Sequence, residues 1–276
     1  MVIQSERQLK RIIARGIDVN TKLFGDSTLL HFAATNGKVR CIRTLHELGA
    51  RLEEEDEHGA TAVHLATYRG YEECVRVLHD LGANINHKRD DGRTPLHIAC
   101  LHGYVSIVRI LIESGATLTE EDNDTLTPIH LAALGRKELG AACIHVLCES
   151  GTMITAKDRR SYTPLHCAAL VGNIHCIRSL CEKGAVVNDE DWYGYTPMHL
   201  AALRNHFDCV CFLFKKGARL SALNNFGQTA RGVAFEENHA TTVGVLKKYE
   251  VRARWAKIHA GARLLALHGR AVVTAN

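Results

Sequence analysis

The chain has 276 residues, of which 46% are hydrophobic and 23% are charged, and its formal net charge is +4. This composition agrees with a soluble intracellular chain. We do not expect a membrane-spanning protein, because no apolar run approaches the roughly 20 residues of a membrane-spanning helix. We do not expect a secreted one either, because the charged start, with Glu6, Arg7, Lys10 and Arg11, lacks the apolar core of a signal peptide. We therefore expect a protein of the cytoplasm or the nucleus.

From residue 16 onward, glycines recur at steps of 33, 33, 33, 36, 33 and 33 residues, at Gly16, Gly49, Gly82, Gly115, Gly151, Gly184 and Gly217. A fixed period of this length is typical of a solenoid, in which each repeat contacts only its neighbours. We therefore expect one repeat domain, where the length alone would suggest about two globular domains.

A histidine precedes each glycine from Gly49 on, by 21 residues at Gly151 and by 18 at the others, and closes a string that reads TLLH, TAVH, TPLH, TPIH, TPLH or TPMH, at His31, His64, His97, His130, His166 and His199. All four prolines directly follow the threonine of this string, at Pro95, Pro128, Pro164 and Pro197. Threonine caps helix N-termini and proline is accepted at the first helical position, so the string predicts the start of a helix in each repeat.

Each predicted first helix contains small alanine residues and ends at a glycine or an asparagine, such as Gly103 or Asn205, which tolerate the left-handed conformation of a helix end. A second helix follows, with apolar residues such as Val108 and Leu111 at helical spacing. The fourth repeat is three residues longer than the others, around 135–140, and we expect the additional residues to lengthen the turn between its two helices.

These strings resemble the ankyrin-repeat family, whose consensus pairs TPLHxAAxxG with a second helix that ends in GADVN. The resemblance covers about residues 1–246: a half repeat at 1–20, six repeats with the histidine string, and a degenerate repeat at 229–246. It implies an all-α ankyrin-repeat solenoid of helix-turn-helix units joined by hairpin-like fingers, in which the first helices and the fingers line a concave groove. It also implies that the histidine of the string hydrogen-bonds backbone between repeats.

Ten cysteines and 17 histidines raise the question of a metal site or a thiol enzyme. Five of the cysteines occupy one repeat position, eight residues before the glycine, where the third repeat has Ile107: Cys41, Cys74, Cys143, Cys176 and Cys209. A position that accepts isoleucine is a small buried one, in which cysteine packs as an apolar residue. Neither a CxxC pair nor a known catalytic motif occurs. We expect no enzymatic activity, no metal, no cofactor and no small-molecule substrate.

In the ankyrin family, the two residues after the alanine pair face the groove, and in five successive repeats the first of them is Tyr68 or a leucine. Two interpretations remain open: each leucine packs against the turn of its own repeat, or together they form an apolar stripe for a protein partner. We expect a monomeric scaffold or adaptor for protein–protein interaction, with these candidate binding residues: Tyr68, Arg69, Leu101, His102, Leu134, Leu170, Val171, Leu203 and Arg204.

The predicted fingers alternate in charge along the chain: acidic at 53–57, largely basic at 88–93, acidic at 120–124 and basic at 157–160. Ion pairs between neighbouring fingers explain this alternation without a binding role. The sixth finger also carries aromatic residues of the types that dominate binding hot spots, although a fingertip that packs on its neighbour is equally compatible: Trp192, Tyr193 and Tyr195.

Residues 247–276 leave the repeat pattern and carry a net charge of +6, whereas the preceding residues carry −2. Apolar residues at helical spacing predict a basic amphipathic helix. This helix either caps the repeats or acts as a regulatory or targeting element for calmodulin, an acidic partner or an anionic membrane surface, and a single basic tail is a weak signal for nucleic acid. The candidate residues are Lys247, Lys248, Arg252, Arg254, Trp255 and Lys257.

Three asparagines stand four residues after a periodic glycine and follow a β-branched residue: Asn20, Asn86 and Asn188. This setting is similar to the site of the asparagine hydroxylase that acts on ankyrin repeats in animals, and it is equally that of a turn asparagine that bonds locally.

Overall fold

The structure is a computed structural model that describes the backbone of residues 6–273, with the side chains of the same range except Gln8, Ile12, Lys257, Ile258 and 260–273. The described residues form helices and no strand. The chain divides into two compact units, the first made of Met1–Ala168 and His175–Val186 and the second of Ala169–Ile174 and Val187–Asn276.

The first unit contains a 3₁₀ turn at Phe24–Asp26 and the helices α1 (Glu6–Ile13), α2 (Leu29–Thr35), α3 (Val39–Glu47), α4 (Ala62–Tyr68), α5 (Glu72–Asp80), α6 (Pro95–His102), α7 (Val105–Glu113), α8 (Pro128–Leu134) and α9 (Lys137–Glu149). Helices α10 (Pro164–Val171) and α11 (Ile174–Glu182) contain residues of both units. The second unit adds α12 (Pro197–Leu203), α13 (Phe207–Lys215), α14 (Ala230–Glu236) and α15 (Ala240–Val273).

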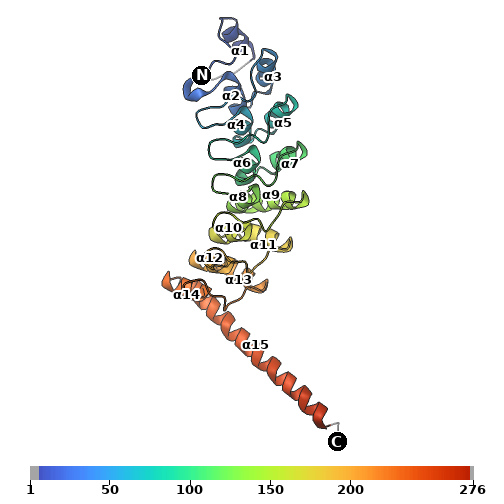
Figure 1. The fold of residues 1–276 in the computed structure, drawn as a ribbon, viewed down its shortest axis with the longest axis vertical. Coiled ribbons are helices and arrows are strands. Elements are labelled where there is room, and N and C mark those ends of the chain that lie inside the picture. The colour runs from blue at the N-terminus through green and yellow to red at the C-terminus, as the bar shows by residue number, and fades with distance from the viewer. Residues whose placement is uncertain (1–5, 274–276) are drawn as a thin grey trace. The chain divides into compact units, whose positions relative to one another are not determined.

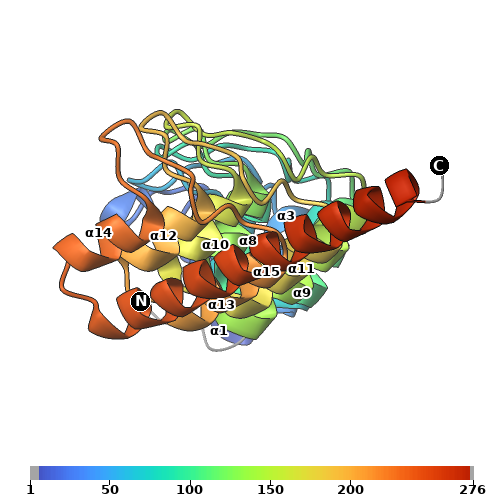
Figure 2. The same cartoon turned by 90° about the horizontal axis from the view of Figure 1, so that it is seen from below.

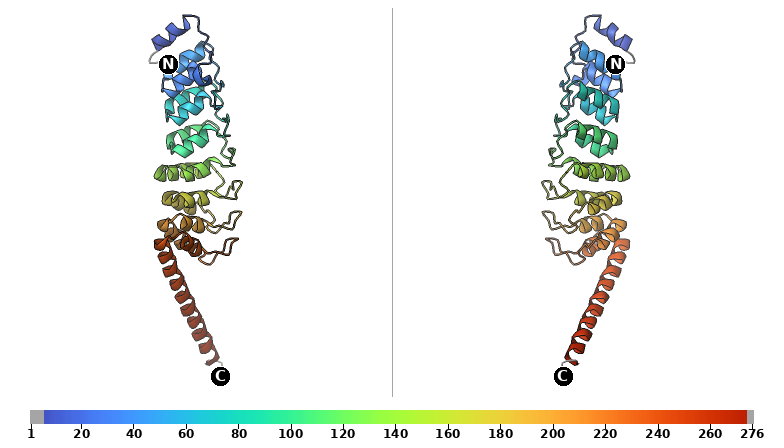
Figure 3. Two further views of the ribbon diagram at one scale, coloured as in Figure 1. Left: turned by 90° about the vertical axis from the view of Figure 1, so that its left-hand side faces the viewer. Right: turned by 90° about the vertical axis from the view of Figure 1, so that its right-hand side faces the viewer.

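Helix pairs of the first unit lie in two rows. The first helices α2, α4, α6 and α8 pack on one another in sequence, and the second helices α3, α5, α7 and α9 do the same (Figure 1). The loops that join successive pairs lie along one edge of this unit (Figures 2 and 3). The prediction of an all-α arrangement of repeated helix-turn-helix units is therefore confirmed.

The string histidine joins each helix start to the following repeat. The backbone N–H of Thr94 donates to His97 Nδ1 at 3.2 Å, so this nitrogen carries no proton and His97 Nε2–H donates to Leu126 O at 3.0 Å. Burial lowers the pKa of His97 to about 4, which keeps the ring neutral at physiological pH. The same bond to the next finger is made by His31, His64, His130 and His199. The implied role of this histidine is confirmed at these positions.

The fourth repeat differs from expectation. Only Gly135 and Arg136 separate α8 from α9, while α9 is 13 residues long and the other second helices have nine. The prediction of a longer turn is wrong, because the additional residues extend the helix. Gly140 allows this: a Cβ there would lie 2.4 Å from Ala132 O and 3.2 Å from Cys176 Sγ, so only glycine lets the added turn lie against α8.

The five cysteines that share a repeat position are buried, with at most 2% of each residue exposed, and Ile107 at the equivalent position is 0% exposed. Burial raises the pKa of Cys74 to about 11 and that of Cys209 to about 12, so these thiols are protonated and unreactive at neutral pH. The interpretation of this position as a small apolar core position is confirmed.

In the second unit, the start of α15 is packed and its continuation is exposed. Thr242 Oγ1 donates to Asn205 Oδ1 at 2.8 Å, Leu246 is 1% exposed, and the ring of Tyr249 stacks on Phe214 at 4.2 Å. Beyond these contacts, Val251 and Trp255 are 48% and 59% exposed. The predicted end of the repeat domain, between residues 246 and 247, lies inside this helix.

Candidate functional site

Four side chains at the ends of α4 and α6 form a cluster that we call the turn cluster: Tyr68, Arg69, His102 and Tyr104. The ring of Tyr68 meets His102 edge-on at 5.0 Å, His102 stacks on Tyr104 at 5.5 Å, and Arg69 lies over Tyr68 at 5.9 Å. Burial, helped by the charge of Arg136, lowers the pKa of His102. Tyr68 remains 49% exposed, so the cluster presents a supported aromatic ring to solvent.

Tyr104 belongs to the turn cluster although the sequence did not single it out. A Cβ on Gly70 would lie 3.1 Å from Tyr104 Cζ, so the ring of the third repeat covers the glycine turn of the second. Gly70 has a φ of +76°, a conformation that other residues rarely adopt. The signal was present in the repeat register, because Tyr104 stands 33 residues after Tyr71.

The leucines of the predicted stripe are half-buried. Leu101 and Leu134 in the first unit, like Leu170 and Leu203 in the second, are neither core residues nor freely exposed. Val171 is 43% exposed and Arg204 is exposed. This intermediate exposure is compatible with either interpretation of the leucines, and the stripe stays a prediction.

Four aromatic side chains of the second unit form what we call the finger cluster: Trp192, Tyr193, Tyr195 and Phe226. Tyr193 stacks on Phe226 with ring centroids 6.4 Å apart, and the backbone N–H of Asn225 donates to Tyr193 O at 2.9 Å. The fingertip therefore packs on its neighbour, and it still exposes 71% of Trp192, 55% of Tyr193 and 64% of Phe226. The sequence missed Phe226, which stands 33 residues after Tyr193.

Charged residues of neighbouring fingers in the first unit pair with one another. Lys88 Nζ lies 2.8 Å from Glu120, Arg93 Nε lies 3.2 Å from Asp122, and Arg159 pairs with Asp124. The exposed pairs Lys88–Glu120 and Arg159–Asp124 stabilise a fold by about 0–1 kcal/mol each. The alternation of acidic and basic fingers therefore has a structural explanation in this unit.

The three candidate hydroxylation sites also link repeats. Asn86 Nδ2 donates to Gly115 O at 3.3 Å and its Oδ1 accepts the backbone N–H of Thr117 at 2.8 Å. Asn20 makes the same pair of bonds with Gly49 and Arg51, and Asn188 with Gly217 and Arg219, according to the same register. The asparagines thus bond to the following repeat, which the sequence interpretation of a local turn bond did not include.

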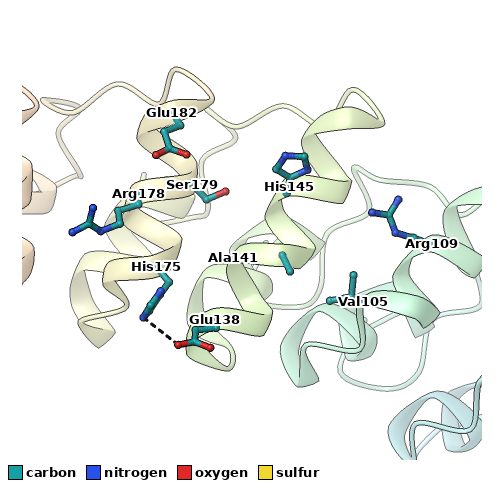
Figure 4. Close-up of a pocket in the computed structure, with 10 residues that line it drawn as sticks. Val105, Arg109, Glu138, Ala141, His145, His175, Arg178, Ser179 and Glu182 are labelled. Atoms are coloured by element: carbon teal, nitrogen blue, oxygen red, sulfur yellow. Dashed lines mark ion pairs between the residues drawn. The ribbon is translucent and has the colours of Figure 1, made fainter.

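A cavity of about 490 Å³ lies among the second helices α7, α9 and α11 of the first unit (Figure 4). Arg109, His145 and Arg178 line it from one repeat position, six residues before the periodic glycine. His175 lies 3.8 Å from Glu138, and the figure shows these two side chains pointing toward each other. Sequence reasoning missed this cavity, whose acidic and basic side chains largely offset one another.

Among the residues that the structure describes, no group of three or more His, Cys, Asp or Glu side chains is placed to hold a metal ion. Within the same described residues, no helix combines the length and the apolar character that a membrane span needs. In α15, Lys247, Lys248, Arg252, Arg254 and Trp255 are exposed, and Lys257 lies outside the described side chains.

Comparison with known proteins identifies the repeat. Two family models match the chain: "Ankyrin repeats (3 copies)" at residues 138–224, and "Ankyrin repeats (many copies)" at 30–79 and 63–112. No curated protein matches the chain in sequence. Among solved structures, the human ASB11 ankyrin repeat domain is similar, with 27% identity over 80% of this chain and 96% of that one and a TM-score of 0.71. Repeats of this kind are generally protein–protein interaction modules. The residues that the two family models match, 30–112 and 138–224, contain the helix pairs, interrepeat histidine bonds and glycine turns described above, and they belong to the ankyrin-repeat family.

Proposed function

We propose that the protein is a non-catalytic scaffold or adaptor that binds a protein partner through exposed side chains on its fingers and first-helix ends. The fold supports this proposal at the level of class, because ankyrin repeats generally bind proteins. Fold alone does not choose a partner, so the argument depends on particular surfaces.

The observation that carries the proposal is the finger cluster. Trp192, Tyr193 and Phe226 each leave more than half of their surface in solvent, although burial of one large apolar side chain is worth about 1.5–3 kcal/mol. Tyr193 and Phe226 stack, and bonds from Asn225 to the carbonyls of Trp192 and Tyr193 hold the two loops together. Little conformational entropy is then lost when a partner covers these rings.

The test compares a pair of exposed aromatic positions in the finger cluster with a single exposed aromatic position outside it, by proximity labelling in cells. The double variant Trp192→Ser, Phe226→Ser removes two exposed rings of the finger cluster, and Phe235→Ser removes a ring of α14 that is 71% exposed. We expect the finger variant to lose its main labelled partner and to bind the purified partner at least about tenfold more weakly. The Phe235 variant should bind as the wild type does. If the wild type, the finger variant and the Phe235 variant all label the same partners, the proposal is refuted.

The stripe along the first-helix ends remains part of the proposal as a second contact. Tyr68→Ser is the cleaner test of it, because Tyr68 is 49% exposed whereas glutamate at the half-buried Leu101 or Leu134 would also strain the fold. Loss of partner binding with an unchanged melting temperature would support the stripe. Unchanged binding would leave the fingers as the sole contact.

The exposed basic part of α15 favours a second candidate function. A regulatory or targeting role would use Lys247, Lys248, Arg252 and Arg254, whose side chains are exposed, together with Trp255. Binding of purified protein to calmodulin and to vesicles containing phosphatidylserine tests this role. Binding that weakens steeply with added salt supports it, since exposed charges are screened over about 10 Å at 0.1 M salt. No binding to either probe at low salt would exclude these two targets.

We also infer that the protein works in a reducing compartment, the cytoplasm or the nucleus. Cys41, Cys74 and Cys209 are buried as free thiols in apolar positions, and thiols persist where glutathione keeps them reduced. Fluorescence microscopy of the tagged full chain tests this; accumulation in the secretory pathway would contradict it.

A further inference from the structure

A second cavity, of about 520 Å³, lies within the second unit. It is lined by the end of α13, the loop at 217–221, the start of α14 and residues 250–254 of α15. We call it the α13–α15 cavity. Its size falls in the range of ligand-binding pockets, about 300–1,000 Å³. None of the finger-cluster residues lines it.

Three arginines from three different elements line the α13–α15 cavity: Arg219 from the loop, Arg231 from α14 and Arg254 from α15. Glu250 is the single carboxylate among the lining residues that the structure describes, and it lies 3.1 Å from Arg231 Nε. No carboxylate of the described residues pairs with Arg219 or Arg254. The cavity therefore has a net charge of +2 and two arginines with unused donors.

The same cavity has an apolar wall. Phe214, Leu220 and Ala253 contribute to it, and the ring of Phe214 is fixed by its stacking on Tyr249 at 4.2 Å with an interplanar angle of 20°. A preformed apolar wall favours an occupant with a large apolar group, because little ordering is needed on binding. Arg219 and Arg254 are exposed, so charges of the occupant would lie nearer to solvent than its apolar group.

We propose that the α13–α15 cavity binds an acidic peptide segment in which one large apolar side chain has a carboxylate before and after it. The guanidinium group forms two parallel hydrogen bonds with a carboxylate, which explains why arginines and not lysines suit this site. The two arginines stand on separate elements and so favour two carboxylates over one. This site goes beyond the proposed function, because neither the finger cluster nor the first-helix ends form it, and it shares only Arg254 with the basic part of α15 considered above.

The test uses full-length protein and fluorescein-labelled seven-residue peptides. The probe peptide has one phenylalanine flanked by two glutamates on each side, and the comparison peptides replace phenylalanine by serine or the glutamates by glutamines. Fluorescence anisotropy at about 0.15 M salt measures binding, since at this salt exposed charges beyond about 8 Å are screened. We expect the probe peptide to bind and both comparison peptides to bind at least about tenfold more weakly.

Matched variants distinguish a cavity from diffuse attraction to the basic helix. Arg219→Gln with Arg254→Gln removes two charges from the cavity, and Lys247→Gln with Lys248→Gln removes two exposed charges outside it. Ala253→Glu places a carboxylate in the cavity, whereas Ala256→Glu makes the same change at an exposed position of the same helix. We expect the first member of each pair to weaken binding at least about tenfold and the second to change it less than about twofold.

Three results would overturn the proposal: no binding of the probe peptide at about 1 mM, equal losses within each variant pair, or equal binding of the serine peptide. Preference for vesicles or for a small anionic amphiphile over the peptide, with the same loss in the Arg219 and Arg254 variant, would also overturn it and reassign the cavity. Because these variants leave Trp192 and Phe226 intact, failure here is separate from failure of the proposed function.

Discussion

Replacement of Gly140 by alanine tests why the fourth repeat accepts a longer second helix. In an exposed helix interior this change stabilises by about 1 kcal/mol, because glycine loses more backbone entropy on folding. At Gly140 the new Cβ would lie 2.4 Å from Ala132 O, a backbone atom, where ordinary contact begins at 3.4 Å. Helix α9 would have to move by about 1 Å from α8, and overpacking of this kind costs about 1–3 kcal/mol. The difference between the two effects is a net loss of about 1 kcal/mol.

Two other helical glycines serve as controls for Gly140→Ala. A Cβ on Gly244 in α15 meets nothing within 4 Å, and one on Gly232 in α14 comes no closer than 3.7 Å to any atom. Alanine at either position should raise the free energy of unfolding by about 0.5–1 kcal/mol. Urea unfolding followed by circular dichroism measures all three variants. If Gly140→Ala proved as stable as the wild type, the close approach of α9 to α8 would not be what requires glycine.

Three further outcomes follow from burial and packing. The free energy of unfolding should fall as the pH drops from 6.5 to about 4, by about 3 kcal/mol for each of His64 and His97. The reason is that burial lowers the pKa of these histidines to about 4 in the folded protein, so the unfolded chain takes up protons first. Urea midpoints that stay constant over this pH window would contradict the prediction. A thiol reagent should modify few of the ten cysteines quickly in the native protein and all of them in denaturant, and mass spectrometry should find the fast group among the partly exposed ones, Cys148, Cys181 and Cys211. Truncation before Lys247 should lower the melting temperature, because it removes the Tyr249 stack on Phe214 and the Glu250 pair with Arg231. Truncation after Val251 keeps both contacts and should leave the melting temperature within about 2 °C of that of the full chain. If both truncations lowered the melting temperature equally, the capping contacts would lie in later residues.

The fold could be predicted because its determinants recur in the sequence at a fixed period. Threonine and histidine at helix starts and cysteine eight residues before the glycine each act within one repeat or between neighbours, so the register alone locates them. The extension of α9 could not be predicted in the same way. It depends on the space between Gly140 and Ala132, which no spacing rule describes.

The candidate sites were harder to predict, because they depend on exposure and on contacts between distant residues. Leu101 is half-buried, and the sequence string around it does not distinguish this intermediate exposure from full burial or full exposure. Arg219, Arg231 and Arg254 stand apart in the sequence and line one cavity only after α15 packs against α13. Phe226 and Tyr104 were visible in the register, and the sequence interpretation passed over them because their strings are atypical.

The interrepeat histidine bond has a consequence for how such chains can change in length. His130 reaches Tyr162 O at 3.0 Å across 32 residues, while His97 reaches Leu126 O at the same distance across 29. The three added residues are absorbed as helix at the N-terminal end of α9, so the link between successive repeats is unaffected by them. In this chain a repeat can therefore be longer than its neighbours without a change in the histidine bond that joins it to the next repeat. An engineer could add about one helical turn at the same place in another repeat, with a glycine facing the first helix, and expect the fingers to keep their spacing.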